Sequence, residues 1–299
     1  MKKITGNQRK QIKRGELIIN LHPNNFRLEL TSVWSFPNRG DWATHSGKYR
    51  GNWSPFVPRN LILRYSKPRD WILDQFVGSG TTLVEAKLLN RNAIGIDINP
   101  QSVSISETNL IFQCESISKI YVKQGNAADL AFMKDSKIDF ICTHPPYADI
   151  IRYSKDIKGD ISLLSVDSFL DEMGKVAKEA YRVLKKGKYC AVMIRDIREH
   201  GKVIPLGFQM MQCFLETGFT IKEIIIKKQH NCKSTEYWKK INRDILLLAH
   251  EYIFVYDFVI EKRYYNGCRK TVCGSSVCQM GRWKTTVNST DKRKNAGEI

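Results

Sequence analysis

The fold of this chain is decided by Asp74-Gln75-Phe76-Val77-Gly78-Ser79-Gly80-Thr81-Thr82, a glycine-rich stretch that directly follows the apolar run at residues 71–73. A second stretch, Thr143-His144-Pro145-Pro146-Tyr147, follows the apolar run at residues 138–142. Both runs are typical of buried strands. In an open parallel sheet, ligands bind outside the carboxyl ends of the strands, where the strand order reverses. We therefore expect both loops to face one crevice, with a nucleotide-like cofactor at the glycines and a planar base at the prolines.

Strand and helix patterns alternate through most of the chain. Strands are predicted at residues 71–74, 93–98, 120–123, 138–143, 189–195, 219–227 and 245–256. Helices are predicted at residues 81–89, 102–112, 166–184 and 206–216, with Gly187 and Gly218 following the last two. This alternation predicts an α/β fold, a seven-stranded, mostly parallel sheet with helices on both faces.

The charge of the chain is unusual for its length. Its 299 residues carry a net charge of +18, which favours a polyanionic partner because Lys and Arg displace counterions from phosphates. Solubility or a cationic tail is the alternative explanation. Residues 1–27 hold seven Lys or Arg and one acid, and residues 262–299 hold nine and two. We predict a basic arm at residues 1–30, one domain at 31–260 and a flexible basic tail at 261–299.

Cysteine usage and hydropathy predict a compartment. Most of the eight cysteines stand alone in apolar runs, as reduced thiols do in cytosolic proteins. The chain begins without an apolar stretch of signal-peptide length, and charged residues interrupt the apolar segment at 245–260. We expect a cytoplasmic protein without a membrane span. Cys268, Cys273 and Cys278 have a spacing that suits zinc, but only three ligands are present, so we expect free thiols and no metal site.

The glycine loop favours a cofactor with a ribose. Glycines between a strand and a helix let the backbone approach a ligand, and the helix N-terminus offers free N–H groups. The nicotinamide-binding template G-x-G-x-x-G fails because Leu83 stands where its third glycine would be. Asp97 ends the next strand, where an acid suits ribose hydroxyls. Asn126 follows the third strand, where it suits an adenine edge or, alternatively, an Asx turn.

The proline loop offers fixed hydrogen-bond acceptors beside an aromatic ring. Pro145 and Pro146 stiffen the backbone and push the residue before them into extended geometry. The carbonyls of His144 and Pro145 are therefore candidate acceptors, and Tyr147 offers a flat face for stacking. The alternative is that the prolines only end a strand and that Tyr147 belongs to the edge of the core.

These motifs in combination resemble the site-specific DNA amino-methyltransferases, which methylate cytosine N4 or adenine N6 with S-adenosylmethionine. The resemblance extends over about residues 31–260. It rests on residues 52–62 with Arg64-Tyr65-Ser66, on the glycine loop, on Gly95-Ile96-Asp97-Ile98-Asn99-Pro100, on the proline loop and on His250-Glu251-Tyr252-Ile253-Phe254-Val255. The glycine loop precedes the catalytic loop, which is one of the known motif orders of that family.

The resemblance implies a Rossmann-like class I methyltransferase fold and S-adenosyl-L-methionine as the cofactor. The implied cofactor-binding residues are Asp74, Phe76, Gly78, Ser79, Gly80, Thr81, Asp97, Asn126 and Thr143. The implied catalytic residues are His144, Pro145, Pro146 and Tyr147. Acceptors at 144 and at the Pro145 carbonyl would bind the N–H protons of an exocyclic amine, and Tyr147 would stack on the flipped base. The rate gain would come from alignment, without a covalent intermediate.

Three positions depart from the family pattern. Gln75 stands where proline is usual, and Asn126 where an acid is common, which weakens the expected adenine contact. His144 stands where the cytosine-N4 group has serine and the adenine-N6 group has aspartate or asparagine. Because no acid precedes the prolines, we favour cytosine N4 over adenine N6.

Two basic and aromatic segments are candidates for nucleic-acid binding. Residues 34–56 mix aromatic side chains with Arg39, Lys48 and Arg50, although a lid packed on the sheet is the alternative. Residues 227–243 include Lys233, Lys239 and Lys240. We expect double-stranded DNA as the partner, within a restriction-modification system or with a specificity partner. The competing functions are an RNA methyltransferase acting on a guanine amine in tRNA, and an inactive DNA-binding protein of the same fold.

Overall fold

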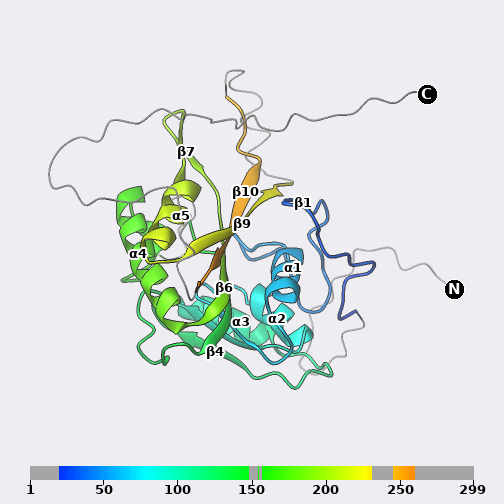
Figure 1. Cartoon of the computed structure of the whole chain (residues 1–299). Coiled ribbons are helices and arrows are strands. Elements are labelled where there is room, and N and C mark those ends of the chain that lie inside the picture. The colour runs from blue at the N-terminus through cyan, green and yellow to red at the C-terminus, as the bar shows by residue number, and fades with distance from the viewer. Residues whose placement is uncertain (1–19, 148–153, 155–156, 231–244, 260–299) are drawn as a thin grey trace, which may run out of the picture. The chain divides into compact units, whose positions relative to one another are not determined.

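The computed structural model describes residues 20–147, 154, 157–230 and 245–259, which form a sheet flanked by helices (Figure 1). The strands are β1 (Val33–Ser35), β2 (Trp71–Asp74), β3 (Asn92–Asp97), β4 (Ile120–Gln124), β5 (Ile138–Thr143), β6 (Leu184–Ile194), β7 (Ile197–Glu199), β8 (Lys202–Ile204), β9 (Thr220–Lys228) and β10 (His250–Asp257). The helices are α1 (Phe56–Tyr65), α2 (Thr81–Leu88), α3 (Pro100–Asn109), the 3-10 helix η1 (Ile161–Leu163), α4 (Val166–Val183) and α5 (Leu206–Glu216).

The described strands form an eight-stranded sheet of order β1-β9-β10-β6-β5-β2-β3-β4 and a separate β7–β8 hairpin. All neighbours in the large sheet are parallel except β10, which runs antiparallel to both β6 and β9. The strand order reverses at β2 and β5, so the loops that follow these strands leave the sheet side by side. The fold is therefore the predicted Rossmann-like class I arrangement.

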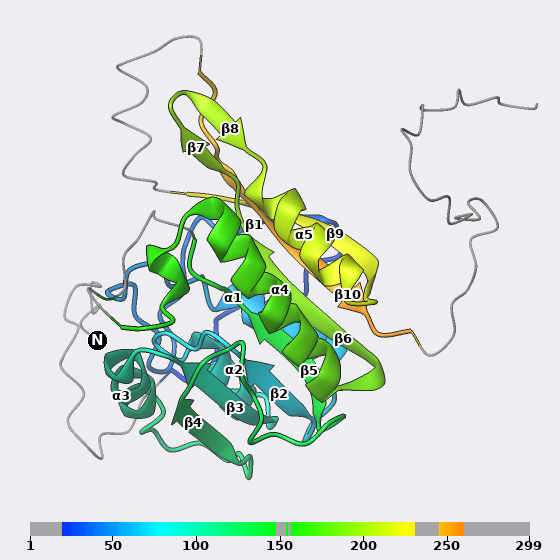
Figure 2. The same ribbon diagram turned by 90° about the vertical axis from the view of Figure 1, so that its left-hand side faces the viewer.

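Helices cover both faces of this sheet, and each face has its own hydrophobic core. Figure 2 shows α4 and α5 lying along one face, where a core that includes Phe169, Met173 and Phe214 is buried. A second core, which includes Leu61, Ile72 and Leu83, is buried on the other face under α1 and α2. The apolar stripe of α4 explains its placement, because its buried residues recur at helical spacing from Phe169 to Val183.

The structure confirms the seven predicted strands and contains elements that were not predicted, among them α1, the β7–β8 hairpin and β1. β1 adds an eighth strand, which pairs with β9 from Val33↔Ile226 to Ser35↔Lys228. The prediction that Gly187 follows the end of a helix is wrong, because α4 ends at Val183 and β6 begins at Leu184. Gly187 instead has a φ of +74° inside β6, where the register with β5 shifts between Ile138 and Phe140.

The described part of the predicted N-terminal arm packs on the domain. The backbone N–H of Ala43 donates to the Asn20 carbonyl at 2.7 Å, and that of Glu29 to Oδ1 of Asn60 at 2.8 Å. The predicted C-terminal tail lies outside the described residues, and the predicted domain boundaries stay predictions. No helix within the described ranges has both the length and the hydropathy that a membrane span requires.

Candidate active site

One cavity opens at the carboxyl ends of β2, β3 and β5. Both predicted loops line it: Asp74 to Ser79 from the glycine loop, and His144 to Tyr147 from the proline loop. Asp97 and Asn126 line it as well. The expectation that the two loops face one crevice is confirmed by this geometry.

Asp74 ties the two loops together at the base of the cavity. Its buried carboxylate accepts hydrogen bonds from the hydroxyls of Thr82 and Thr143, the latter at 2.8 Å, and from the backbone N–H of Phe76 at 3.1 Å. Burial raises the pKa of Asp74 to about 6, although these hydrogen bonds act in the opposite direction. Asp74 is thus a structural link between β2, α2 and β5.

The glycine loop approaches α3 so closely that a side chain at position 80 would clash. Gly80 has a φ of +83°, and a Cβ there would lie 2.5 Å from Oγ of Ser106. The residues that line the cavity do not include Gly80, Thr81 or Thr143. The Thr81 hydroxyl instead donates to Oδ1 of Asn52, which does line the cavity. Phe76, Gly78 and Ser79 line the cavity directly.

Asp97 presents a carboxylate to the cavity from the end of β3. It accepts hydrogen bonds from the backbone N–H of Gly78 at 2.9 Å and of Asn99 at 3.0 Å. Burial raises the pKa of Asp97, and the nearby carboxylate of Asp160 acts in the same direction. Asp160 also lines the cavity, where it caps η1 by accepting from the backbone N–H of Ser162.

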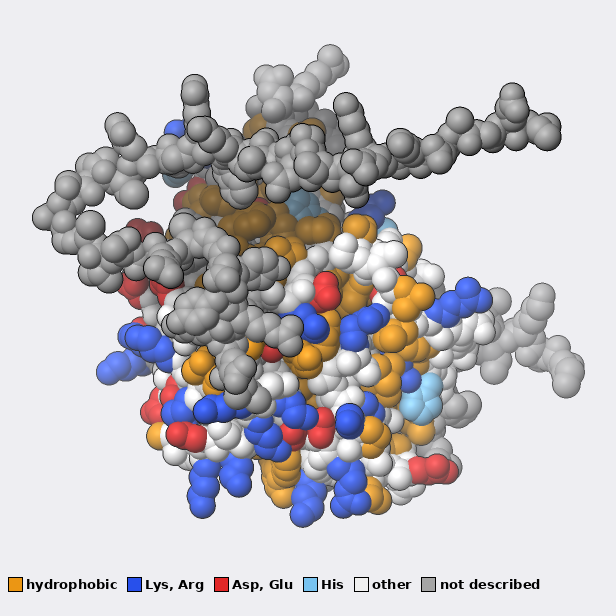
Figure 3. All heavy atoms as spheres, viewed as in Figure 1, with side chains coloured by type: hydrophobic (Ala, Val, Ile, Leu, Met, Phe, Trp, Pro, Cys, Tyr) orange, Lys and Arg blue, Asp and Glu red, His pale blue; other side chains and the backbone are white. Residues whose placement is uncertain are grey.

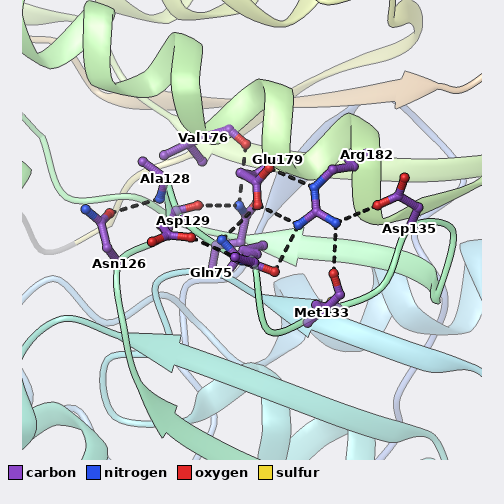
Figure 4. A network of polar contacts seen from close by, with 12 residues as sticks. Gln75, Asn126, Ala128, Asp129, Met133, Asp135, Val176, Glu179 and Arg182 are labelled. Carbon is purple, nitrogen blue, oxygen red and sulfur yellow. Dashed lines mark hydrogen bonds and ion pairs between the residues drawn. The ribbon is translucent and has the colours of Figure 1, made fainter.

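Asn126 and Gln75 both line the cavity, and Figure 4 shows them among the polar contacts beside α4. Oδ1 of Asn126 accepts from the backbone N–H of Ala128 at 2.9 Å, which is the Asx turn considered above. Nε2 of Gln75 donates to the Ala127 carbonyl at 3.2 Å and lies 3.5 Å from the Val176 carbonyl. Oε1 of Gln75 is buried and has no hydrogen-bond partner among the described residues.

The loop that carries Asn126 is held onto α4 by one arginine (Figure 4). The Arg182 guanidinium donates to the carbonyls of Leu130 and Met133 and to the carboxylates of Glu179 and Asp135, at 2.7–2.9 Å. Hydrogen bonds to these carboxylates raise the pKa of Arg182 well above its ordinary value. The guanidinium is therefore a permanent positive charge that fixes this side of the cavity.

The proline loop is joined to β9 and β10 by a chain of polar contacts. Nε2 of His144 lies 2.7 Å from the Tyr147 hydroxyl, which donates to Oε1 of Glu251 at 2.9 Å. Oε2 of Glu251 accepts from Nζ of Lys227 at 2.7 Å. Burial would raise the pKa of Glu251, but the Lys227 charge, the His144 ring and the hydrogen bonds from Lys227 and Tyr147 together lower it.

Aromatic and cationic groups pack on this loop. The indole of Trp53 stacks on the His144 ring with centroids 5.4 Å apart, and the Arg195 guanidinium lies 5.4 Å from the centroid of the buried Tyr147 ring. Burial lowers the pKa of His144 to about 4, and the positive charges of Lys227, Arg195 and Arg39 oppose the raising effect of Glu251. His144 is therefore neutral near pH 7.

The candidate nucleic-acid residues divide into three groups. Lys48 and Arg50 are exposed and flank Tyr49, which lines the cavity. Arg39 is half-buried and donates from Nη1 to the Asn52 carbonyl at 2.8 Å, so it braces a loop. Lys233, Lys239 and Lys240 lie outside the described residues.

Most aromatic side chains of residues 34–56 pack against the domain, as in the alternative to a binding surface, while Tyr49 and Trp53 also line the cavity. Trp34, Trp42 and Trp53 are buried. The Trp42 indole donates to the buried carboxylate of Glu85 at 2.7 Å, and Nη1 of Arg59 donates to the same group at 2.8 Å. On the face shown in Figure 3, Lys and Arg side chains are spread over the region of α2, α3 and β4.

Several residues that line the cavity received no role from the sequence, and Tyr49, Trp53 and Asp160 are polar or aromatic ones close to the predicted groups. Tyr49, whose hydroxyl lies 2.9 Å from Oγ of Ser102, and Trp53 stood within the aromatic segment but received no individual role. Asp160 lay in a loop without a motif, and its approach to Asp97 depends on tertiary structure. No group of His, Cys, Asp or Glu in the described ranges could hold a metal ion, and the three tail cysteines lie outside those ranges.

The cavity fits the cofactor that the resemblance implies. A carboxylate at the end of β3 matches ribose hydroxyls, and a backbone turn after β4 matches an adenine edge. The unpartnered Oε1 of Gln75 offers a further acceptor at the cavity wall. Asp97 and Asp160 provide negative charge, which suits a ligand carrying a sulfonium and an ammonium group.

Comparisons with known proteins return methyltransferases. The DNA methylase family model matches residues 1–108 and 138–296, and the RMKL-like methyltransferase domain model matches residues 62–196. The chain is similar to the type II methyltransferase M.BsoBI of Geobacillus stearothermophilus, with 28% identity over 68% of this chain and 45% of that protein. It is also similar to the type II methyltransferase M1.MboII of Moraxella bovis, with 51% identity over 24% of this chain and 30% of that protein.

Two further similarities concern proteins of other types. The tRNA (guanine(10)-N2)-dimethyltransferase of Methanothermobacter thermautotrophicus is 38% identical over 33% of this chain and 29% of its own length. The crystal structure of TrmN from Thermus thermophilus superposes with a TM-score of 0.48 and 16% identity over 70% of this chain and 50% of that one. The chain thus matches less than half of the length of each of these relatives from sequence comparison.

Proposed function

The chain belongs to the DNA methylase family, and from this membership we propose that it methylates an exocyclic amine of a base in duplex DNA, namely cytosine N4. The observation that carries the proposal is the single cavity shared by the glycine loop and the proline loop. A methyl donor and an extruded base must meet in one enclosed place, and loops at the carboxyl ends of adjacent parallel strands provide it.

The cofactor of this family and fold is S-adenosyl-L-methionine, which when bound supplies a methyl group on a positively charged sulfur. We propose that Asp97 accepts hydrogen bonds from the ribose hydroxyls, since its carboxylate lines the cavity and is already aligned by two backbone donors. The backbone from Phe76 to Ser79 would line the methionine part, and the turn at Asn126 the adenine edge.

The chemistry of this chain's own residues is hydrogen bonding to the target amine. An exocyclic amine is a poor nucleophile because its lone pair is delocalised into the ring, and acceptors on its N–H groups restore tetrahedral character. We propose that neutral His144 and the Pro145 carbonyl are these acceptors. The low pKa of His144, about 4, supports this role because a protonated ring could not accept a hydrogen bond. The base would stack against the ring of Tyr147, which lines the cavity.

Cytosine N4 is favoured because position 144 carries no acid. His144 stands where the adenine-N6 group has Asp or Asn. Its neutral ring forms hydrogen bonds only through its two nitrogens and offers no carboxylate or amide oxygen. The second candidate is methylation of a guanine amine in tRNA, which the 38% identity to the tRNA (guanine(10)-N2)-dimethyltransferase supports. A restriction endonuclease or a specificity subunit as partner stays a prediction.

Nucleoside mass spectrometry tests the proposal. DNA and tRNA from cells that express the chain are digested and compared with those from cells that express His144→Ala. We expect N4-methylcytosine in DNA from the wild type only. N6-methyladenine in DNA would show that adenine is the target base, and N2-methylguanosine in tRNA would favour the second candidate. The absence of any new methylated nucleoside would refute the proposed activity.

A further inference from the structure

The contacts around His144 determine which of its ring nitrogens carries the proton. Three side chains from separate elements line up behind the ring: Tyr147 after β5, Glu251 on β10 and Lys227 on β9. The successive distances are 2.7 Å from Nε2 of His144 to the Tyr147 oxygen, 2.9 Å from that oxygen to Glu251, and 2.7 Å from Glu251 to Lys227. All three lie within hydrogen-bond range.

Only one arrangement of protons satisfies the contacts from His144 through Tyr147 and Glu251 to Lys227. Glu251 is ionised because Lys227 holds its pKa below the ordinary value, so it only accepts. The Tyr147 hydroxyl has a single proton, and it donates that proton to Glu251. Towards His144 the hydroxyl therefore presents a lone pair, and the contact at 2.7 Å requires a proton on Nε2 of His144.

We infer that Tyr147, Glu251 and Lys227 are positioning residues that lock His144 in the tautomer with the proton on Nε2, so that Nδ1 is the acceptor offered to the target amine. Nδ1 has no hydrogen-bond partner among the described residues, and His144 lines the cavity. The assignment of Nδ1 to the amine rests on the proposed function, whereas the tautomer lock itself does not.

The neighbouring groups explain why the lock holds a neutral ring. The charged groups that face His144 are Glu251, Lys227, Arg195 and Arg39. Three of these four are cations, so a second proton on the ring is opposed by burial and by repulsion together. The stacked indole of Trp53 fixes the plane of the ring, and the hydroxyl of Tyr147 then fixes its rotation.

This device accounts for the departure from the family pattern at position 144. A serine hydroxyl or an asparagine amide reaches an acceptor geometry by simple rotation. A neutral imidazole accepts hydrogen bonds through only one of its two nitrogens. Nδ1 of His144 is that acceptor only when Nε2 carries the proton. The tyrosine of the proline loop thus has two proposed duties, stacking through its ring and tautomer selection through its hydroxyl.

The first test reads the tautomer directly. Long-range ¹H–¹⁵N NMR of the full chain distinguishes the two neutral imidazole tautomers, and His144→Asn assigns the signal among the six histidines. We expect the Nε2–H form in the wild type and a mixture of tautomers in Tyr147→Phe and Glu251→Gln. Tyr252→Phe is the matched control, because its hydroxyl also donates to a carboxylate, Asp196, from β10, but Tyr252 does not line the cavity. An Nδ1–H signal in the wild type, or an unchanged signal in Tyr147→Phe, would overturn the inference.

The second test concerns catalysis. Tyr147→Phe keeps the ring, so we expect kcat to fall about tenfold with little change in KM for DNA, while Tyr252→Phe keeps wild-type kinetics. His144→Asn places an amide oxygen near the position of Nδ1, whereas His144→Gln places it near that of Nε2. We expect partial activity in the first and none above background in the second. The reverse order would overturn the assignment of Nδ1, and it would do so without affecting the nucleoside result that decides the proposed function.

Discussion

The Thr143 hydroxyl donates a hydrogen bond of 2.8 Å to Oδ1 of Asp74, and this bond joins the carboxyl end of β5 to that of β2. It therefore links the starts of the glycine loop and the proline loop, in addition to the backbone pairing of the two strands. Thr143→Val keeps the shape of the side chain and removes the donor. We expect a loss of about 1–2 kcal/mol in the free energy of unfolding, because a buried carboxylate loses one of its three donors.

Chemical denaturation followed by circular dichroism measures this loss. Thr108→Val is the matched control, because its hydroxyl donates to the Ser104 carbonyl on an exposed part of α3. We expect that control to change the free energy of unfolding by less than about 0.5 kcal/mol. Equal effects of the two substitutions would show that the hydrogen bond between Thr143 and Asp74 contributes no more to the free energy of unfolding than an exposed one.

A second prediction follows from the pKa of Asp74, which burial raises from its ordinary value of 3.8 to about 6. A carboxyl with a raised pKa in the folded state binds its proton more tightly there than in the unfolded state. Its contribution to stability is therefore greatest below about pH 4 and is lost as the pH rises to 6, by up to about 3 kcal/mol. Asp74→Asn should remove this part of the dependence.

The measurement is the difference in the free energy of unfolding between wild type and Asp74→Asn from pH 4 to pH 7. Taking the difference cancels the other titrating groups. We expect the variant to gain stability relative to the wild type as the pH rises. A difference that does not vary with pH would contradict the raised pKa.

The sheet and its helices were predictable because periodicity and turn residues agree along most of the domain. The strand that ends at Asp74 and the one that ends at Thr143 were located correctly from apolar runs and the loops after them. β1 escaped notice because a three-residue strand leaves no periodic pattern. Gly187 was misplaced because a glycine with positive φ marks a bulge as readily as a helix end.

The site was predictable where it lies in a loop and not where it depends on packing. The meeting of the two loops followed from strand order alone. The contact of Glu251 with Tyr147 joins residues 104 positions apart and needs the antiparallel β10, which no local pattern specifies. The aromatic segment was ambiguous because Trp34 and Trp42 suit a stacking surface and a packed lid equally well, and burial decides between them.

The third prediction is the pH dependence of methyl transfer. An unperturbed histidine would lose activity below about pH 6.5, whereas burial lowers the pKa of His144 to about 4. Since the neutral ring is the acceptor, the single-turnover rate should stay constant from pH 8 to about 5 and fall only through about pH 4. His144→Ser should lack this fall, with circular dichroism at each pH to verify that the fold persists. An acid limb near pH 6.5 that disappears in the variant would show that His144 is solvated.

The fourth prediction concerns the cofactor. Asp97→Asn retains the size of the side chain but removes the charge that aligns with the backbone N–H groups of Gly78 and Asn99. We expect S-adenosylmethionine to bind about ten- to a hundredfold more weakly, because hydrogen bonds to a charged group contribute about 1.5–3 kcal/mol. Isothermal titration calorimetry measures this, with Asp167→Asn in the first turn of α4 as the control. Unchanged affinity in Asp97→Asn would remove Asp97 from the cofactor site.

The last prediction concerns the basic side chains within residues 34–56, which differ in their burial. Lys48 and Arg50 are exposed beside the cavity, so each Ala substitution should weaken duplex DNA binding and reduce the slope of log K against log salt by about 1. Arg39 braces the Asn52 carbonyl, so Arg39→Ala should lower stability as well as affinity. Fluorescence anisotropy at several salt concentrations measures the slopes, and Lys175→Ala on the exposed face of α4 is the control. If Lys48→Ala and Lys175→Ala give the same slope as the wild type, DNA approaches the cavity from another side.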